Sequence, residues 1–148
     1  MYPITIKEFA ALPVIDGIKQ CPGNTDYSMI KYFAEGCSFA EGCSFAEQCS
    51  FAEQCSFAKW CSFERGKTLI GHCLYMANGF GSADRMTYGI PTKEKVYIRC
   101  GCWSGTLQEF RARIDQEYVN TPIHHEYTLV ADLFEARWLR EKGTQSAT

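Results

Sequence analysis

The chain has 148 residues, a formal net charge of −2 and nine cysteines. This length suits one compact domain, and the near-neutral charge gives no reason to expect direct binding to nucleic acid or to a membrane surface. The first residues lack the basic stretch and apolar run of a signal peptide, and no apolar run approaches the ~20 residues that span a bilayer. We therefore expect a cytoplasmic protein without membrane contact.

The first 32 residues predict an N-terminal helical cap. Thr5 can cap a short helix that runs to Leu12, because Glu8 stands three residues later and completes a capping box. Pro13 follows the expected end of this helix, and Cys21 to Asn24 predict a turn.

A six-residue repeat covers Phe33 to Leu74. Its best copies read Phe-Ala-Glu-Gly-Cys-Ser or Phe-Ala-Glu-Gln-Cys-Ser. A helix of about 3.6 residues per turn would spread the phenylalanines over three sides, so the period excludes an amphipathic helix. The evenly spaced thiols indicate reduced, buried side chains rather than a disulfide framework, and they are Cys37, Cys43, Cys49, Cys55 and Cys61.

An extended chain gives this repeat a geometric interpretation. Each Cys and the Phe two residues later point to the same side, while Ala-Glu-Gly can form a corner. Three hexads then close a three-sided coil of eighteen residues, and parallel pairing between coils needs a dry interior. The expected columns are Cys37, Cys55 and Cys73; Phe33, Phe51 and Leu69; Phe39, Phe57 and Tyr75; and Phe45 with Phe63.

The remaining chain predicts one strand and two helices. Lys95 to Trp103 alternates between apolar and polar residues, as in a strand, and a helix is expected to start at Ser104-Gly105-Thr106. Thr121-Pro122 predicts the start of a second helix that Gly143 ends. Each helix has a predicted apolar stripe: Leu107, Phe110, Ile114 and Tyr118 in the first, and Ile123, Tyr127, Val130, Phe134 and Trp138 in the second. The predicted fold class is therefore α+β: a short triangular parallel β-helix (β-solenoid) capped by an N-terminal helix and by a C-terminal strand plus αα-hairpin. The predicted segments are 1–32, 33–90 and 91–148.

The repeat Phe-Ala-Glu-Gly-Cys-Ser resembles that of left-handed β-helix hexapeptide proteins, with Phe in the usual aliphatic position. Its Cys-x-Phe core also resembles the pentapeptide-repeat family. The order of the whole chain, including Val-Tyr-Ile-Arg-Cys-Gly-Cys and Gly-Thr-Leu-Gln-Glu-Phe, resembles small phage and prophage proteins. That resemblance implies binding to a host macromolecule, with an inhibitor of a host defence protein as one form, and location in the host cytoplasm.

Two groups of repeat residues are candidate binding sites. The corner glutamates suggest an acidic surface that imitates nucleic-acid phosphates, but solvated corners also explain them, and Lys59 interrupts the acidity. These glutamates are Glu35, Glu41, Glu47 and Glu53. Trp60 replaces the Gly or Gln of other copies and is a candidate interface anchor, unless it packs within the monomer.

Two further candidates could bind an anion. Ser82 and Arg85 lie in a Gly-rich stretch that could hold a phosphate, and Ser104 lies at an expected helix start. Neither segment matches a phosphate-binding fingerprint, and a turn and a helix cap explain them structurally.

The sequence gives little support for a catalytic site or a metal site. His72 is the only histidine in the repeat, where it fits a polar corner, and Cys100-Gly101-Cys102 lacks a second pair of ligands. We therefore predict a non-catalytic binding protein without cofactor or metal, which recognises a protein partner and can form homo-oligomers. The alternatives are a small-ligand or nucleotide binder and a hexapeptide-type acyltransferase.

Overall fold

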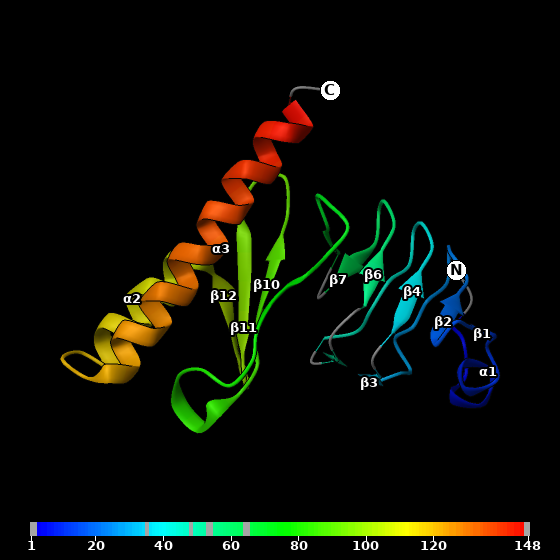
Figure 1. Cartoon of the computed structure of the whole chain (residues 1–148), viewed down its shortest axis with the longest axis horizontal. Coiled ribbons are helices and arrows are strands. Elements are labelled where there is room, and N and C mark those ends of the chain that lie inside the picture. Colours follow the sequence, from blue (N-terminus) through cyan, green and yellow to red (C-terminus); the bar gives the residue numbers. More distant parts are fainter. Residues whose placement is uncertain (1–2, 35, 48, 53–54, 64–65, 147–148) are drawn as a thin grey trace. The chain divides into compact units, whose positions relative to one another are not determined.

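The computed structural model describes residues 3–34, 36–47, 49–52, 55–63 and 66–146. The chain divides into two compact units, an N-terminal unit over Met1–Cys73 and a C-terminal unit over Leu74–Thr148 (Figure 1). Each unit buries its own set of apolar side chains. Among the described residues, no helix has the length and apolar character needed to cross a membrane.

The N-terminal unit begins with the predicted helix α1 (Ile6–Ala10). The capping box is confirmed: Glu8 N donates to Thr5 Oγ1 at 3.1 Å, and Thr5 N donates to Glu8 Oε1 at 3.0 Å. Strands β1 (Val14–Ile15) and β2 (Ile18–Cys21) then form a hairpin. Asp16 and Gly17 make its turn with φ values of 52° and 78°, as a tight hairpin requires.

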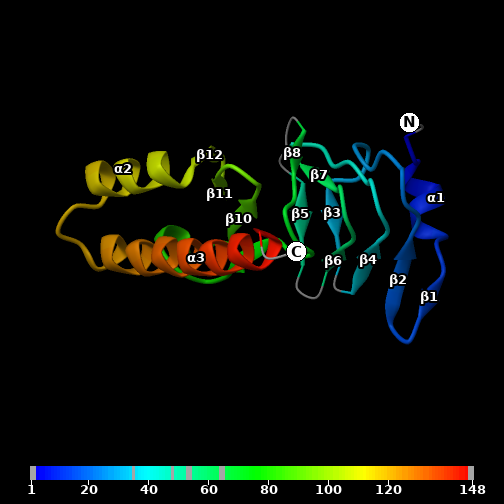
Figure 2. The same ribbon diagram turned by 90° about the horizontal axis from the view of Figure 1, so that it is seen from above.

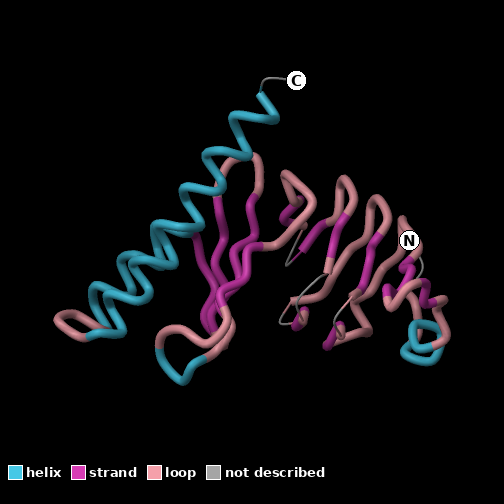
Figure 3. The backbone as a smooth tube through the Cα atoms, in the orientation of Figure 1, coloured by secondary structure: helices cyan, strands magenta, loops and turns pink. Residues whose placement is uncertain are grey.

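The repeat forms strands of two or three residues (Figure 3). They are β3 (Tyr32–Phe33), β4 (Cys37–Phe39), β5 (Ser50–Phe51), β6 (Ser56–Phe57), β7 (Ser62–Phe63) and β8 (Lys67–Thr68). Parallel pairs join β2 to β4, β4 to β6, and β3 to β5. Strands β7 and β8 pair antiparallel, so the chain reverses at the end of the repeat.

The phenylalanine rings of the repeat form the core of this unit. Rings eighteen residues apart stack nearly parallel, with centroid distances of 4.8 Å for Phe33–Phe51, 5.2 Å for Phe39–Phe57 and 4.8 Å for Phe45–Phe63. Rings of adjacent columns meet edge to face, for example Phe39 and Phe45 at 4.8 Å and 90°. Both geometries are favourable for aromatic quadrupoles. The six rings are therefore packed against one another as the spacing predicts.

The predicted fold class is nevertheless wrong. In place of a triangular parallel β-helix, the described part of the chain is α+β with several small sheets, mostly antiparallel, with helices towards both ends and no solenoid. The physical reason is that the strands of the repeat are too short to build a continuous sheet, and β7–β8 turns back on itself. Tyr75 also leaves the predicted column with Phe57 and joins the core of the C-terminal unit.

The C-terminal unit contains the largest antiparallel sheet, with strand order β12-β11-β10-β9. Its strands are β9 (Tyr75–Ala77), β10 (Thr87–Pro91), β11 (Val96–Cys100) and β12 (Trp103–Thr106). The predicted strand from Lys95 to Trp103 is thus two strands that turn at Gly101. Strand β10 was missed because all five of its residues are buried, so it shows no alternation.

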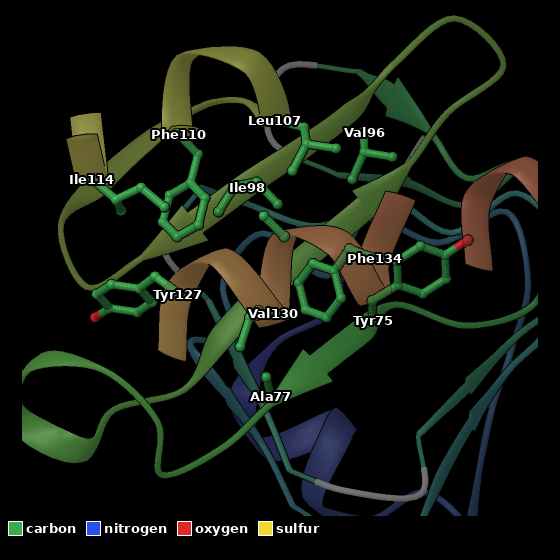
Figure 4. Packing of buried hydrophobic residues seen from close by; sticks show 11 residues of the cluster. Tyr75, Ala77, Val96, Ile98, Leu107, Phe110, Ile114, Tyr127, Val130 and Phe134 are labelled. Carbon is green, nitrogen blue, oxygen red and sulfur yellow. The ribbon is translucent and has the colours of Figure 1, made fainter. Parts of the chain in front are cut away.

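Helices α2 (Leu107–Glu117) and α3 (Pro122–Ser146) lie on one side of this sheet as an αα-hairpin (Figures 1 and 2). Their predicted apolar stripes are confirmed, since Phe110, Ile114, Tyr127, Val130 and Phe134 pack in the core (Figure 4). Helix α3 starts at Pro122 as expected. The prediction that this helix ends at Gly143 is wrong, because the helix continues to Ser146.

Candidate functional site

The loop between β9 and β10 holds Ser82 in the short 3-10 helix η1 (Ser82–Asp84) and Arg85 directly after it. Tyr127 of α3 fixes this loop, because Ser82 N donates to Tyr127 Oη at 2.9 Å. Tyr118 Oη, at the end of α2, lies 3.3 Å from Ser82 Oγ. Gly81, with φ of 79°, passes over Tyr127 so closely that a Cβ there would overlap the ring. The loop is thereby anchored to both helices.

Arg85 points across the turn that joins β11 to β12. Its Nε donates to the carbonyl oxygen of Ser82 at 3.3 Å. Its guanidinium lies against Gly101, where an added Cβ would require Nη1 to shift, and the φ of 61° at Gly101 also favours glycine. A main-chain bond and a glycine contact therefore hold the Arg85 side chain over this turn.

A cavity of about 220 Å³ opens beside Arg85 within the C-terminal unit. We call it the arginine pocket. Its lining residues are Ser82, Arg85, Cys100, Cys102, Trp103, Phe110, Arg113, Ile114, Tyr118 and Tyr127. Two of these side chains are positively charged and none is negatively charged. Among the side chains that the structure describes, which do not include that of Asp84, no carboxylate forms an ion pair with Arg85 or Arg113.

Aromatic side chains form the walls of the arginine pocket. The Arg113 guanidinium carbon lies 5.9 Å from the centroid of the Trp103 ring, and Phe110 meets Tyr127 edge to face at 5.4 Å. Burial raises the pKa of Tyr127, so this phenol stays neutral at physiological pH. Its oxygen lies 3.4 Å from Cys100 Sγ and accepts the bond from Ser82. The pocket therefore combines polar groups, aromatic walls and a lining whose charged side chains are both positive.

A second cavity, of about 400 Å³, lies on another part of the same unit. Its lining includes Glu94, Lys95, Arg111 and Glu135, which carry both signs of charge. Arg111 donates to Asp132 at 2.8 Å and contacts Glu135 at 3.5 Å. Because carboxylates already neutralise Arg111, this cavity should attract an anionic ligand less strongly than the arginine pocket does.

The other predicted site residues are placed separately from this pocket. Ser104 lies in β12, is exposed, and does not line the arginine pocket; the helix cap is Thr106. Glu41 and Glu47 are exposed, whereas Glu35 and Glu53 lie outside the described residues. The structure therefore brings Ser82 and Arg85 together, and an acidic surface on the repeat stays a prediction.

Trp60 is 67% exposed and has an unusual backbone conformation. At eighteen-residue intervals, Asn24, Gly42 and Trp60 have φ values of 50°, 74° and 62°. Backbone bonds link these corners: Asn24 N donates to Glu41 O at 2.8 Å and Gly42 N to Lys59 O at 2.9 Å. A left-handed conformation suits Gly or Asn but disfavours a bulky residue. Trp60 thus occupies a corner that the backbone alone would assign to glycine.

Sequence reasoning missed Arg113, Tyr118 and Tyr127 as site residues. The two tyrosines were assigned to the apolar stripes of the helices, and this assignment was incomplete. A buried Tyr needs a partner for its hydroxyl group, and that requirement is the signal that could have linked both tyrosines to the loop at Ser82. Nothing in the spacing of α2 marks Arg113.

Histidine and cysteine side chains are the remaining candidates for metal binding or nucleophilic chemistry. Among the described residues, no group of three or more His, Cys, Asp and Glu side chains could hold a metal ion. All nine cysteines are free thiols. His72 Nδ1 lies 3.1 Å from the carbonyl oxygen of Phe57, which ties the ring to the main chain of the repeat. Comparisons with protein-family models, with curated proteins and with solved structures found no match.

Proposed function

We propose that this protein is a non-catalytic binding protein and that the arginine pocket takes a small anion attached to a flat apolar group. One observation carries the proposal: the guanidinium groups of Arg85 and Arg113 line one cavity without a carboxylate partner among the described residues. Guanidinium groups form strong, charge-assisted hydrogen bonds to phosphate and carboxylate oxygens.

The lining supports both parts of such a ligand. Ser82 supplies a hydroxyl group beside Arg85, while Trp103 and Tyr118 supply aromatic surface. The volume of about 220 Å³ suits a compact ligand such as an aryl phosphate rather than a dinucleotide. The residues that line the pocket include thiols and hydroxyl groups but no His, Asp, Glu or Lys that could act as their base, which supports binding rather than turnover.

Calorimetric titration with phenyl phosphate tests this proposal, with benzyl alcohol as the neutral ligand of similar shape. We expect heat of binding with the phosphate alone, and weaker binding as salt concentration rises. Arg85→Gln and Arg113→Gln should each weaken binding about 10- to 100-fold, because a hydrogen bond to a charged group contributes about 1.5–3 kcal/mol.

Lys93→Gln is the matched control, because it removes one positive charge from an exposed residue of the same unit that does not line the pocket. It should leave affinity unchanged. Equal binding of phenyl phosphate and benzyl alcohol, or equal losses in all three variants, would contradict the proposal.

Recognition of a macromolecular partner is a second proposed function, and the conformation of Trp60 favours it. An exposed Trp in the left-handed region carries a conformational cost, and such local strain concentrates at functional positions. Trp is also among the residues that dominate binding energy at interfaces. The phage-like order of the chain makes a host protein the partner class to examine first.

Affinity capture from a bacterial lysate tests this second function. A true partner should be retained by the unmodified protein and by Tyr32→Ala, and lost with Trp60→Ala. Tyr32 is a suitable control because it is an equally exposed aromatic residue in the same unit. Proteins captured equally by all three forms would not depend on Trp60 and would contradict its role.

A further inference from the structure

Helix α3 carries apolar residues on two opposite faces. Tyr127, Val130, Ala131 and Phe134 face the core of the C-terminal unit. At about 100° per residue, the opposite face contains Leu129, Leu133, Ala136 and Leu139. Packing against one core needs one apolar stripe, so the second, exposed stripe calls for another explanation.

The outer stripe is exposed in the structure. Leu129, Leu133 and Leu139 keep 54%, 65% and 57% of their surface accessible. Ala136 lies between them and is also exposed. Three exposed leucines on one side of a single helix gather apolar surface there, and gathered apolar surface marks interaction sites more often than scattered apolar residues do.

The two charged residues on this outer face have opposite signs and stand symmetrically about Ala136. Asp132 lies four residues before Ala136 and Arg140 four residues after it. Two of the three leucines share this symmetry, because Leu133 and Leu139 each lie three residues from Ala136, whereas the counterpart of Leu129 is Gly143. The segment from Asp132 to Arg140 is therefore complementary to itself at these positions when read in the opposite direction.

We propose that the outer face of α3 is a dimer interface between two copies of this chain, with the two helices antiparallel and a two-fold axis at Ala136. In this arrangement Leu133 of each copy packs on Leu139 of the other copy, which gives two equivalent contacts. Asp132 faces Arg140 of the other copy, also twice. The small side chain of Ala136 lets the two backbones approach at the axis. A two-fold interface uses the same patch on both subunits, which is the symmetry that this stripe has.

Charge complementarity selects the antiparallel register. Both charged residues already have an interaction within their own subunit, since Asp132 Oδ1 accepts from Arg111 at 2.8 Å and Arg140 also has a partner. A carboxylate can accept, and a guanidinium can donate, further hydrogen bonds. A parallel pairing would instead place Asp132 beside Asp132 and Arg140 beside Arg140, and like charges would oppose association.

Sedimentation velocity across a concentration series tests the dimer. The unmodified protein should show a concentration-dependent dimer, and Leu133→Lys should lower its association constant by about a hundredfold or more, because two leucines leave the interface. Phe80→Lys changes an exposed apolar residue in the β9–β10 loop and should leave the dimer intact. A protein that stays monomeric at every soluble concentration, or a dimer that persists in Leu133→Lys, overturns the proposal.

Charge exchange tests the register. Arg140→Asp should weaken the dimer about tenfold, because it creates two like-charge pairs across the axis. The double variant Asp132→Arg with Arg140→Asp should restore association. Melting curves are recorded in parallel, because the change at Asp132 also disturbs Arg111. If the double variant is folded and associates no better than Arg140→Asp, the antiparallel register is wrong. If the double variant does not fold, the association constants of Leu133→Lys and Arg140→Asp decide whether the proposed dimer stands.

Discussion

The ring planes of Phe39 and Phe57 are 6° from parallel and their centroids lie 5.2 Å apart, although eighteen residues separate them in the chain. Both rings are almost fully buried, and Phe39 also meets Phe33 and Phe45 edge to face. The core of the N-terminal unit thus consists of rings that the repeat spacing brings together.

Phe39→Ala should destabilise the N-terminal unit by about 3–5 kcal/mol, because it removes a buried ring and leaves a cavity among its neighbours. Urea denaturation followed by circular dichroism measures the change. Tyr32→Ala, which truncates an exposed ring in the same unit, should change stability by less than about 0.5 kcal/mol. Equal losses in both variants would show that the stacked rings do not dominate this core.

Trp60→Gly should stabilise the N-terminal unit by up to about 1 kcal/mol, because glycine adopts the left-handed conformation without steric cost. Gly42→Ala, at the equivalent corner, should have the opposite effect, since its φ is 74° and its new Cβ would collide with the Asn24 side chain. Thermal melting of the two variants compares these effects. A loss of stability in Trp60→Gly would instead indicate that the indole ring makes a stabilising contact.

Helix α2 should lose stability in acid through Glu109. Hydrogen bonds from the backbone and side chain of Thr106 hold the pKa of Glu109 below its ordinary value of 4.5. A carboxyl group with a lowered folded-state pKa contributes its stability above the ordinary value, and the contribution is lost as pH falls through the lowered pKa. Glu109→Gln can keep the capping bond but does not titrate. As the pH is lowered from 5 through the pKa of Glu109, the melting temperature of Glu109→Gln should therefore fall less than that of the unmodified protein.

Thr106→Ala provides the control for this capping box, because it removes the side chain that accepts from Glu109 N at 3.1 Å. It should cost about 1 kcal/mol at neutral pH. If Glu109→Gln and the unmodified protein lose stability equally in acid, other carboxyl groups dominate the acid response.

The thiols should react with an alkylating agent in a fixed order. Hydrogen bonding to Cys21, with burial, raises the pKa of Cys37 to about 11, and a bond to Cys37, with burial, raises the pKa of Cys55 further. The thiolate is the reactive form, so both should stay unmodified at pH 8 while exposed Cys102 is labelled first. Peptide mass analysis after brief iodoacetamide treatment measures the order. Labelling of Cys55 before Cys102 in the folded protein would contradict the buried position of Cys55.

The sequence by itself predicted those features that depend on spacing within a segment. The period of six residues predicted the Phe33–Phe51 and Phe39–Phe57 stacks, and the Thr-x-x-Glu pattern predicted the cap of α1. The apolar stripes of α2 and α3 were predicted for the same reason, because helical geometry fixes which residues share a face.

Only the tertiary structure decided how these segments pair and which polar groups meet. The repeat ends in an antiparallel turn at β7–β8, and β10 shows no alternation because both of its faces are buried, so neither pairing could be read from local pattern. Arg85 and Arg113 line one pocket although 27 intervening residues separate them in the chain. Spacing determines the direction of a side chain within its own helix or strand, but contacts between distant segments depend on how whole elements pack, and that packing created the candidate binding site.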